Sequence, residues 1–115
     1  MLGTITCRCD SVTDYYSNPM GKIHGGAMLT WLDCLTSVGI YAFDDKERMA
    51  SVSLNITADF LSAGSIGKPV FFVIKILKVG RSIAFTEFQM LDGKGRLLSS
   101  MTHKKAFVPG HEAKM

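Results

Sequence analysis

A short glycine-rich segment is the part of this sequence best suited to do chemistry. Residues 18–26 read Asn-Pro-Met-Gly-Lys-Ile-His-Gly-Gly and lead directly into an apolar segment, 27–43, whose single acid is Asp33. The first amides of a helix have no carbonyl partner within the helix, and the helix dipole places partial positive charge there. Such a helix start stabilises a carbonyl oxygen that gains negative charge. The pattern therefore predicts acyl chemistry.

Each of these residues also has a simpler interpretation. Gly25 and Gly26 would serve equally well in a tight turn into the helix, and we expect His24 to lock that turn with a hydrogen bond. Asp33 changes the balance, because a carboxylate among apolar neighbours is costly to bury unless it is paired, hydrogen-bonded or at a wet cleft. The helix itself offers no cationic partner besides His24. Asp33 is therefore a candidate catalytic residue.

The spacing of Gly25 and Asp33 predicts a second subunit. They are eight positions apart on one helix, which separates them by about 12 Å along its axis. Reacting atoms must approach within about 3.5 Å, so one subunit cannot bring both residues to one carbonyl. An antiparallel helix from a second subunit would place its own Asp33 beside Gly25. A two-fold dimer would then hold two composite sites.

The rest of the chain predicts the elements that must hold these residues. Apolar residues recur at helical spacing from Ala27 to Phe43 and occupy the other helix faces as well, so this helix is expected at the centre. A solvated loop is expected at 44–48. Five segments separated by turn residues are predicted strands, namely 2–9, 50–60, 70–79, 82–91 and 97–107. One helix and one antiparallel sheet cover each other's apolar faces when the sheet curls around the helix, an α+β fold.

Length and composition fit one small domain. The chain has 115 residues, of which 47% are hydrophobic and 20% charged. We expect a single domain over residues 1–110 and a frayed tail at 111–115. A domain this short buries only about two thirds of its unfolded surface, so self-association would be a natural supplement. We expect a homodimer, and pairing of dimers is left open.

Charge and cysteine content argue against several classes of protein. A net charge of +3 is too weak for a dedicated nucleic-acid binder. Three cysteines leave one unpaired in any internal disulfide scheme, and Cys7 and Cys9 have no second pair for zinc. No apolar run reaches about 18 residues, and the N-terminus lacks the design of a secretion signal or transit peptide. We therefore expect an intracellular, cytoplasmic protein that holds no metal and inserts into no membrane; mitochondrial import is left open.

Several spaced motifs, in order, resemble one family. The element order resembles the hotdog fold, an antiparallel sheet wrapped around one long central helix. The residues resemble hotdog thioesterases of the phenylacetate-degradation and 4-hydroxybenzoyl-coenzyme A type. The matching parts are 18–26 with its His-Gly-Gly, Asp33, the strand 50–57 that contains Ser51, and 78–86. The resemblance implies hydrolysis of fatty or aromatic acyl-coenzyme A to the free acid and coenzyme A. It implies no cofactor, since coenzyme A is part of the substrate.

The resemblance also implies roles for single residues. In that family the amide at the position of Gly25 binds the thioester carbonyl, and the loop asparagine matching Asn18 holds or polarises it. The acid matching Asp33 is general base or nucleophile. The strand serine matching Ser51 positions the attacking water, and the histidine matching His24 orients the loop.

A coenzyme A substrate would need basic neighbours for its phosphates. The cations of the later strands would equally suit a solvated edge. The candidate substrate-binding residues are Gly26, Lys22, Lys78, Arg81, Ser82, Lys104 and Lys105. The acyl chain is expected along Met20, Met28, Trp31 and Phe60, although each would also fit an ordinary core.

The chain departs from the family pattern in two places. It begins later than typical members, which carry a helix and a strand before this point, and Ser53 stands where close relatives carry an acid. Two rival functions stay open. One is a hydratase or dehydratase of acyl thioesters that uses His24 and Asp33, and the other is a non-catalytic dimer that binds acyl-coenzyme A.

Overall fold

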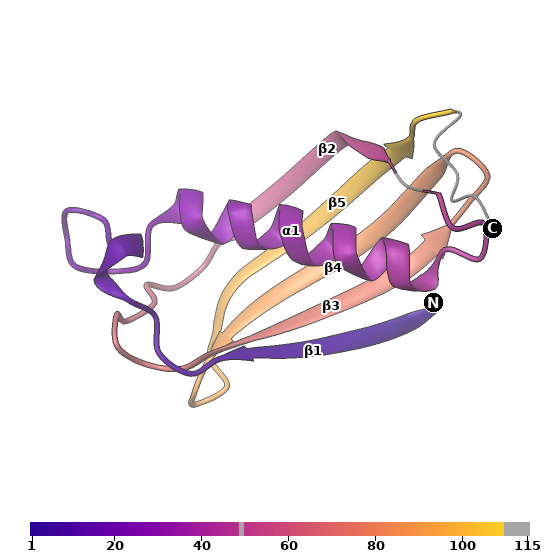
Figure 1. Cartoon of the computed structure of the whole chain (residues 1–115). Helices are drawn as coiled ribbons and strands as arrows, with labels where there is room; N and C mark the ends of the chain where they lie inside the picture. Colours follow the sequence, from indigo (N-terminus) through magenta and orange to yellow (C-terminus); the bar gives the residue numbers. More distant parts are fainter. Residues whose placement is uncertain (49, 110–115) are drawn as a thin grey trace.

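Five antiparallel strands curve around a single long helix in the computed structural model (Figure 1). The structure describes residues 1–48 and 50–109. The elements are β1 (Gly3–Cys9), α1 (Gly25–Phe43), β2 (Ser51–Phe60), β3 (Val70–Val79), β4 (Ile83–Asp92) and β5 (Leu97–Phe107). A 3-10 turn, Asp14–Tyr16, precedes α1. The α+β fold class and the order of elements are confirmed. The predicted tail at 111–115 lies outside the described residues.

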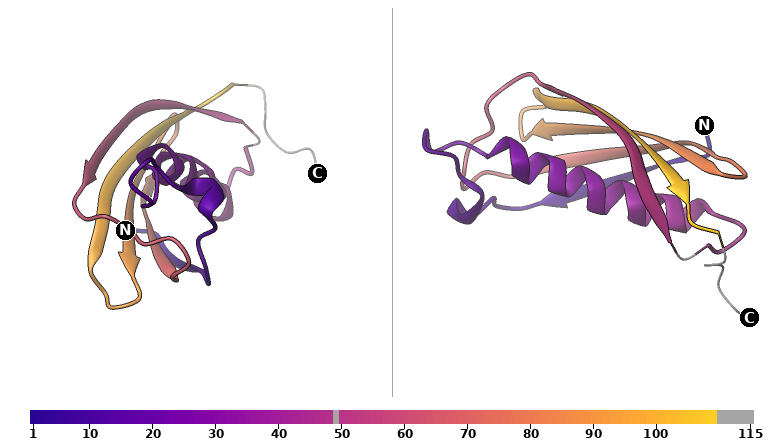
Figure 2. Two further views of the ribbon diagram at one scale, coloured as in Figure 1. Left: turned by 90° about the vertical axis from the view of Figure 1, so that its left-hand side faces the viewer. Right: turned by 90° about the horizontal axis from the view of Figure 1, so that it is seen from above.

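The order of strands across the sheet is β1-β3-β4-β5-β2. Two tight hairpins join β3 to β4 and β4 to β5, and the positive φ of Gly95 (83°) suits the second turn. The long connection through α1 carries the chain from one edge, β1, to the opposite edge, β2. The helix therefore lies in the concave face of the sheet, as the end-on view shows (Figure 2).

The core lies between α1 and the central strands. Side chains alternate between the two faces of a strand, and on β3 the buried set is Val70, Phe72, Ile74 and Ile76. The helix contributes Met28, Leu32 and Ile40. Gly39 brings the helix close to the sheet, because a Cβ atom there would lie only 2.8 Å from Cδ1 of Ile76. The absence of a side chain at Gly39 therefore sets how closely α1 packs against β3.

The end of α1 is fastened by a buried ion pair. Asp44 caps the helix and binds Arg48 at 3.0 Å, and both side chains are buried. Burial alone would raise the pKa of Asp44, but hydrogen bonds from Arg48 outweigh it and the pKa is lowered. Arg48 also donates to the carbonyls of Gly80 and Arg81. The expected solvated loop at 44–48 is therefore wrong for these two residues.

Much of the apolar surface of α1 stays uncovered in a single chain. Val38 and Tyr41 are 62% and 40% exposed, although one side of the helix packs on the sheet. By length and composition alone α1 could cross a membrane. That contradicts the expectation that no segment reaches such a length, because the helix begins at Gly25 rather than Ala27. The apolar residues Met28, Leu32 and Ile40 of α1 are buried against the sheet.

Candidate functional site

A tight turn holds Asn18 just before α1. The side-chain Oδ1 of Asn18 accepts hydrogen bonds from the backbone N–H groups of Met20 (2.9 Å) and Lys22 (3.0 Å). The backbone of Asn18 bonds that of Lys22 as well, at 2.7 Å. Because Oδ1 faces into the turn, the side-chain NH2 group of Asn18 faces out of it. Asn18 can therefore donate to a ligand.

His24 fixes the first turn of α1. It is the N-cap residue, and its Nδ1 accepts a hydrogen bond from the Gly26 amide at 2.8 Å, while its own amide donates to the carbonyl of Tyr16 at 2.7 Å. The Gly26 amide is thus occupied, which leaves no free backbone donor at that candidate residue. The amide of Gly25 forms no hydrogen bond within the described part of the chain. Gly25 is the donor that this helix start offers.

Asn18 and Gly25 open onto one cavity of about 390 Å³. Met20, Met28 and Phe60 line the same cavity, as expected for an acyl chain. The fourth candidate, Trp31, is not among the lining residues and packs between the rings of Tyr16 and Phe72 instead. The cavity therefore combines two polar donors with apolar walls, which is the usual composition of a small-molecule site.

Asp33 lies outside this cavity, farther along α1. Its side chain is 56% exposed in the single chain, so Asp33 avoids the cost of burial among apolar neighbours. Its cationic partner comes from the sheet, because Lys105 Nζ lies 3.9 Å from Asp33 Oδ1. Lys105 is itself buried and donates to Ser37 Oγ at 2.6 Å. This position suits a charge partner for Asp33 better than a phosphate ligand at the surface.

Two serines of β2 have different partners. Ser51 Oγ lies 3.1 Å from the hydroxyl of Tyr41, near the C-terminal end of α1. Ser53 Oγ lies 2.7 Å from Nε2 of His103, a fully buried residue of β5. Burial lowers the pKa of His103, the charge of Lys105 lowers it further, and Asp33 partly opposes them. In the sequence His103 stands only among the cations of the later strands, and its buried position and its contact with Ser53 were not expected.

The remaining basic candidates are spread over the chain. Lys22 lines the cavity at the start of α1. Lys78, Arg81 and Ser82 are exposed near the β3–β4 turn, which lies at the other end of the helix (Figure 1). Lys104 alternates with the buried His103 and Lys105 and faces away from the helix. One chain therefore does not bring these candidates together.

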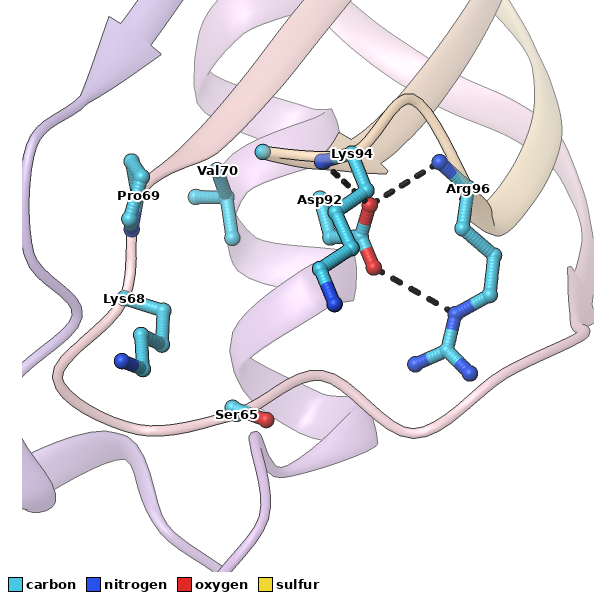
Figure 3. Close-up of a pocket in the computed structure, with 8 residues that line it drawn as sticks. Ser65, Lys68, Pro69, Val70, Asp92, Lys94 and Arg96 are labelled. Atoms are coloured by element: carbon cyan, nitrogen blue, oxygen red, sulfur yellow. Dashed lines mark hydrogen bonds and ion pairs between the residues drawn. The ribbon is translucent and has the colours of Figure 1, made fainter.

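A second cavity, of about 490 Å³, was not expected from the sequence (Figure 3). Its cations are Lys68, Lys94 and Arg96, all exposed. Asp92 is occupied, since it accepts from the amides of Lys94 and Arg96 and pairs with the guanidinium of Arg96 at 3.3 Å. These contacts lower the pKa of Asp92, chiefly through the Arg96 amide. Arg96 also donates to the carbonyl of Ala63, which lines the first cavity.

Comparison with known proteins finds consistent similarities. Residues 20–99 match the family model of the thioesterase superfamily. Acyl-coenzyme A thioesterase 13 of Homo sapiens is 26% identical over 104 residues, which cover 90% of this chain and 72% of the relative. The protein of the same name from Mus musculus is 27% identical over 95 residues, 82% of this chain and 66% of the relative.

Solved structures show the same architecture. Zebrafish thioesterase superfamily member 2 superposes with a TM-score of 0.84 at 24% identity, over 92% of this chain and 75% of that one. A Streptococcus mutans protein crystallised with acetyl-coenzyme A gives 0.83 at 19% identity, over 96% and 85% of the two chains. These similarities confirm the hotdog fold.

Proposed function

This chain belongs to the thioesterase superfamily, and we propose that it hydrolyses acyl-coenzyme A thioesters to a carboxylic acid and free coenzyme A. The observation that carries the proposal is the pair of outward donors, the Gly25 amide and the Asn18 side chain, on one partly apolar cavity. The relatives named acyl-coenzyme A thioesterase 13 support coenzyme A as the leaving group.

The two donors would hold the thioester carbonyl oxygen. When water attacks the carbonyl carbon, negative charge develops on that oxygen, and donors that are already in place stabilise it without reorganisation. The N-terminal end of α1 adds its dipole at the same point. His24 acts indirectly, because by holding the Gly26 amide it fixes the direction of the Gly25 amide.

The second half of the proposed site is the Asp33 of a partner subunit. Gly25 and Asp33 are eight residues apart on one straight helix, or about 12 Å, so an antiparallel partner helix must supply the acid. Asp33 then removes a proton from the attacking water or attacks the carbonyl itself to form a transient anhydride. Both routes need no metal or redox cofactor.

Exposed apolar surface supports the proposed homodimer. The edge strand β2 carries exposed large apolar side chains, and the exposed side of α1 carries others; they are Val52, Leu54, Ile56, Phe60, Val38 and Tyr41. We infer a two-fold axis perpendicular to α1, which would make the two helices antiparallel. It also brings the β3–β4 turn of one subunit, with Lys78, Arg81 and Ser82, toward Lys22 of the other. The phosphates of coenzyme A would bind there.

Release of free thiol from a panel of acyl-coenzyme A esters tests the proposed function. The wild-type protein should release thiol from saturated esters, which a hydratase or dehydratase cannot do. Asp33→Asn should lose most turnover and keep its affinity for coenzyme A. Binding without thiol release by the wild-type protein on any ester would refute hydrolysis in favour of a non-catalytic binding dimer.

A further inference from the structure

A chain of hydrogen bonds runs from the core to the surface beside Asp33. His103 Nδ1 lies 2.8 Å from Thr36 Oγ1 on α1, and His103 Nε2 lies 2.7 Å from Ser53 Oγ on β2. Thr36 and His103 are completely buried, whereas Ser53 is exposed. The network therefore ends in one hydroxyl group that solvent can reach.

The direction of each bond follows from the number of hydrogens. Thr36 Oγ1 donates its only hydrogen to the carbonyl of Leu32 at 2.7 Å, so it must accept from Nδ1–H of His103. A neutral imidazole carries one N–H. Nε2 is then an acceptor, and Ser53 must donate to it. The oxygen of Ser53 consequently presents only lone pairs to the solvent.

Ser53 and Asp33 lie on either side of Lys105. Ser53 is the register partner of Lys105 across the β2–β5 pair, and Lys105 Nζ lies 3.9 Å from Asp33 Oδ1. The contacts of β5 with Thr36 and Ser37 place Ser53 opposite the helical turn that follows Asp33. Ser51, by contrast, lies at Tyr41, about two turns beyond Asp33. The exposed side of this region thus offers two acceptors, a carboxylate and a hydroxyl oxygen.

We propose that Ser53, held by His103 and Thr36, orients the attacking water together with Asp33. This inference rests on the proposed thioesterase function. A water that donates one hydrogen to Asp33 and the other to Ser53 has its lone pair free for the thioester carbon. As the new C–O bond forms, Asp33 takes a proton from the water. The C–S bond then breaks, and this proton passes to the departing sulfur, which leaves free acid, free thiol and the original carboxylate.

Protonation of His103 would reverse this arrangement. An added hydrogen on Nε2 must be donated to Ser53 Oγ, which turns the Ser53 hydrogen outward to where the water's hydrogen would be. Among the described residues, the charged groups that act on His103 are Lys105 from β5 and Asp33 from α1. On β2 the hydroxyl of Ser53 contacts the ring, and on β4 the hydroxyl of Thr86 donates to the His103 backbone carbonyl. Turnover should therefore fall at acidic pH, because Ser53 can no longer accept a hydrogen bond from the water.

The test compares Ser53→Ala with Thr57→Val, a matched loss of a hydroxyl on the opposite face of the same strand. We expect Ser53→Ala to lower kcat by at least about tenfold with KM unchanged, and Thr57→Val to match the wild type. The fall of wild-type kcat that follows His103 protonation should be missing in Ser53→Ala. A purely structural His103 would leave that fall in place.

Two results would overturn the proposal. One is an unchanged kcat for Ser53→Ala, and the other is an identical acid limb in Ser53→Ala and the wild type. Each of these results can be observed only if the wild-type protein releases thiol. If the wild type releases no thiol, the proposed thioesterase function itself has failed, which is a different outcome.

Discussion

The Nζ atom of Lys105 lies 3.9 Å from Oδ1 of Asp33 and donates a hydrogen bond to Oγ of Ser37. The helix that carries Asp33 has no Lys, Arg or His between Gly25 and Phe43, so the sheet supplies the charge. The carboxylate is exposed while the ammonium group is buried. This arrangement keeps the acid open to a substrate and restricts its orientation.

Removing the Lys105 charge should therefore reduce turnover more than binding. We expect Lys105→Met to lower kcat about tenfold, equivalent to ~1.4 kcal/mol of barrier, because Asp33 loses the group that orients it. Steady-state kinetics of thiol release measure this. Lys104→Met is the matched control, since Lys104 points away from the helix; a loss of kcat in that control alone would contradict the assignment.

Mixed dimers test the composite site directly. Asn18→Ala and Asp33→Asn each remove one half of the proposed site, and each alone should lose most activity. In a heterodimer one site regains both intact halves, so a statistical mixture should recover about a quarter of wild-type activity. The measurement is thiol release after the two inactive variants are unfolded and refolded together. If both groups served the same chain, mixing would recover nothing.

The buried His103 predicts a pH dependence of stability. Its pKa is lower in the folded protein than the ordinary value near 6.5, so on acidification the unfolded chain takes up the proton first. The free energy of unfolding should be constant above that ordinary value and fall as the pH drops below it, until the folded pKa is reached.

Urea unfolding between pH 8 and 5 measures this slope. His103→Gln should flatten the slope in the upper part of the range. The lowered pKa values of Asp44 and Asp92 act at lower pH. If the slope is as steep in His103→Gln as in the wild type, the pH dependence of stability comes from other groups.

The ion pair at the end of α1 predicts a large effect on stability. Arg48→Met leaves the Asp44 carboxylate buried without its partner, which typically costs about 3–5 kcal/mol. It also removes the stacking of Arg48 on Phe107, where the guanidinium carbon lies 3.4 Å from the ring centre. Lys46→Met, on the exposed side of the same loop, should stay within about 0.5 kcal/mol. Chemical denaturation compares the two, and equal effects would contradict the prediction.

The fold could be predicted because local signals agree with the tertiary structure. The β3 and β5 bounds match the predicted segments, 70–79 and 97–107, and the other elements differ by at most two residues. Glycine and proline turns separate periodic apolar segments, so the ends of the strands are encoded locally. The hydrogen bonds of the Asn18 and His24 side chains are equally local, since each joins near neighbours in sequence.

The surroundings of Asp33 could not be predicted in this way. The partners Lys105 and Ser37 are 68 residues apart, and His103 and Thr36 are 67 apart. Such contacts depend on which turn of α1 faces which residue of β5. The β-bulge between Ser53 and Asn55 shifts the register of β2 as well. The position of Asp33 in the sequence therefore gave no indication that Lys105 of β5 would be its partner.

The open edge of β2 has a consequence for the fate of newly made chains. One side of this strand pairs with β5, while the other ends the sheet and is flanked by exposed Val52, Leu54 and Phe60. Apolar strand edges of this kind join other strands indiscriminately and nucleate aggregates. Finding a second copy quickly would thus protect the solubility of the chain, and a surplus of unassembled copies should precipitate before it loses its secondary structure.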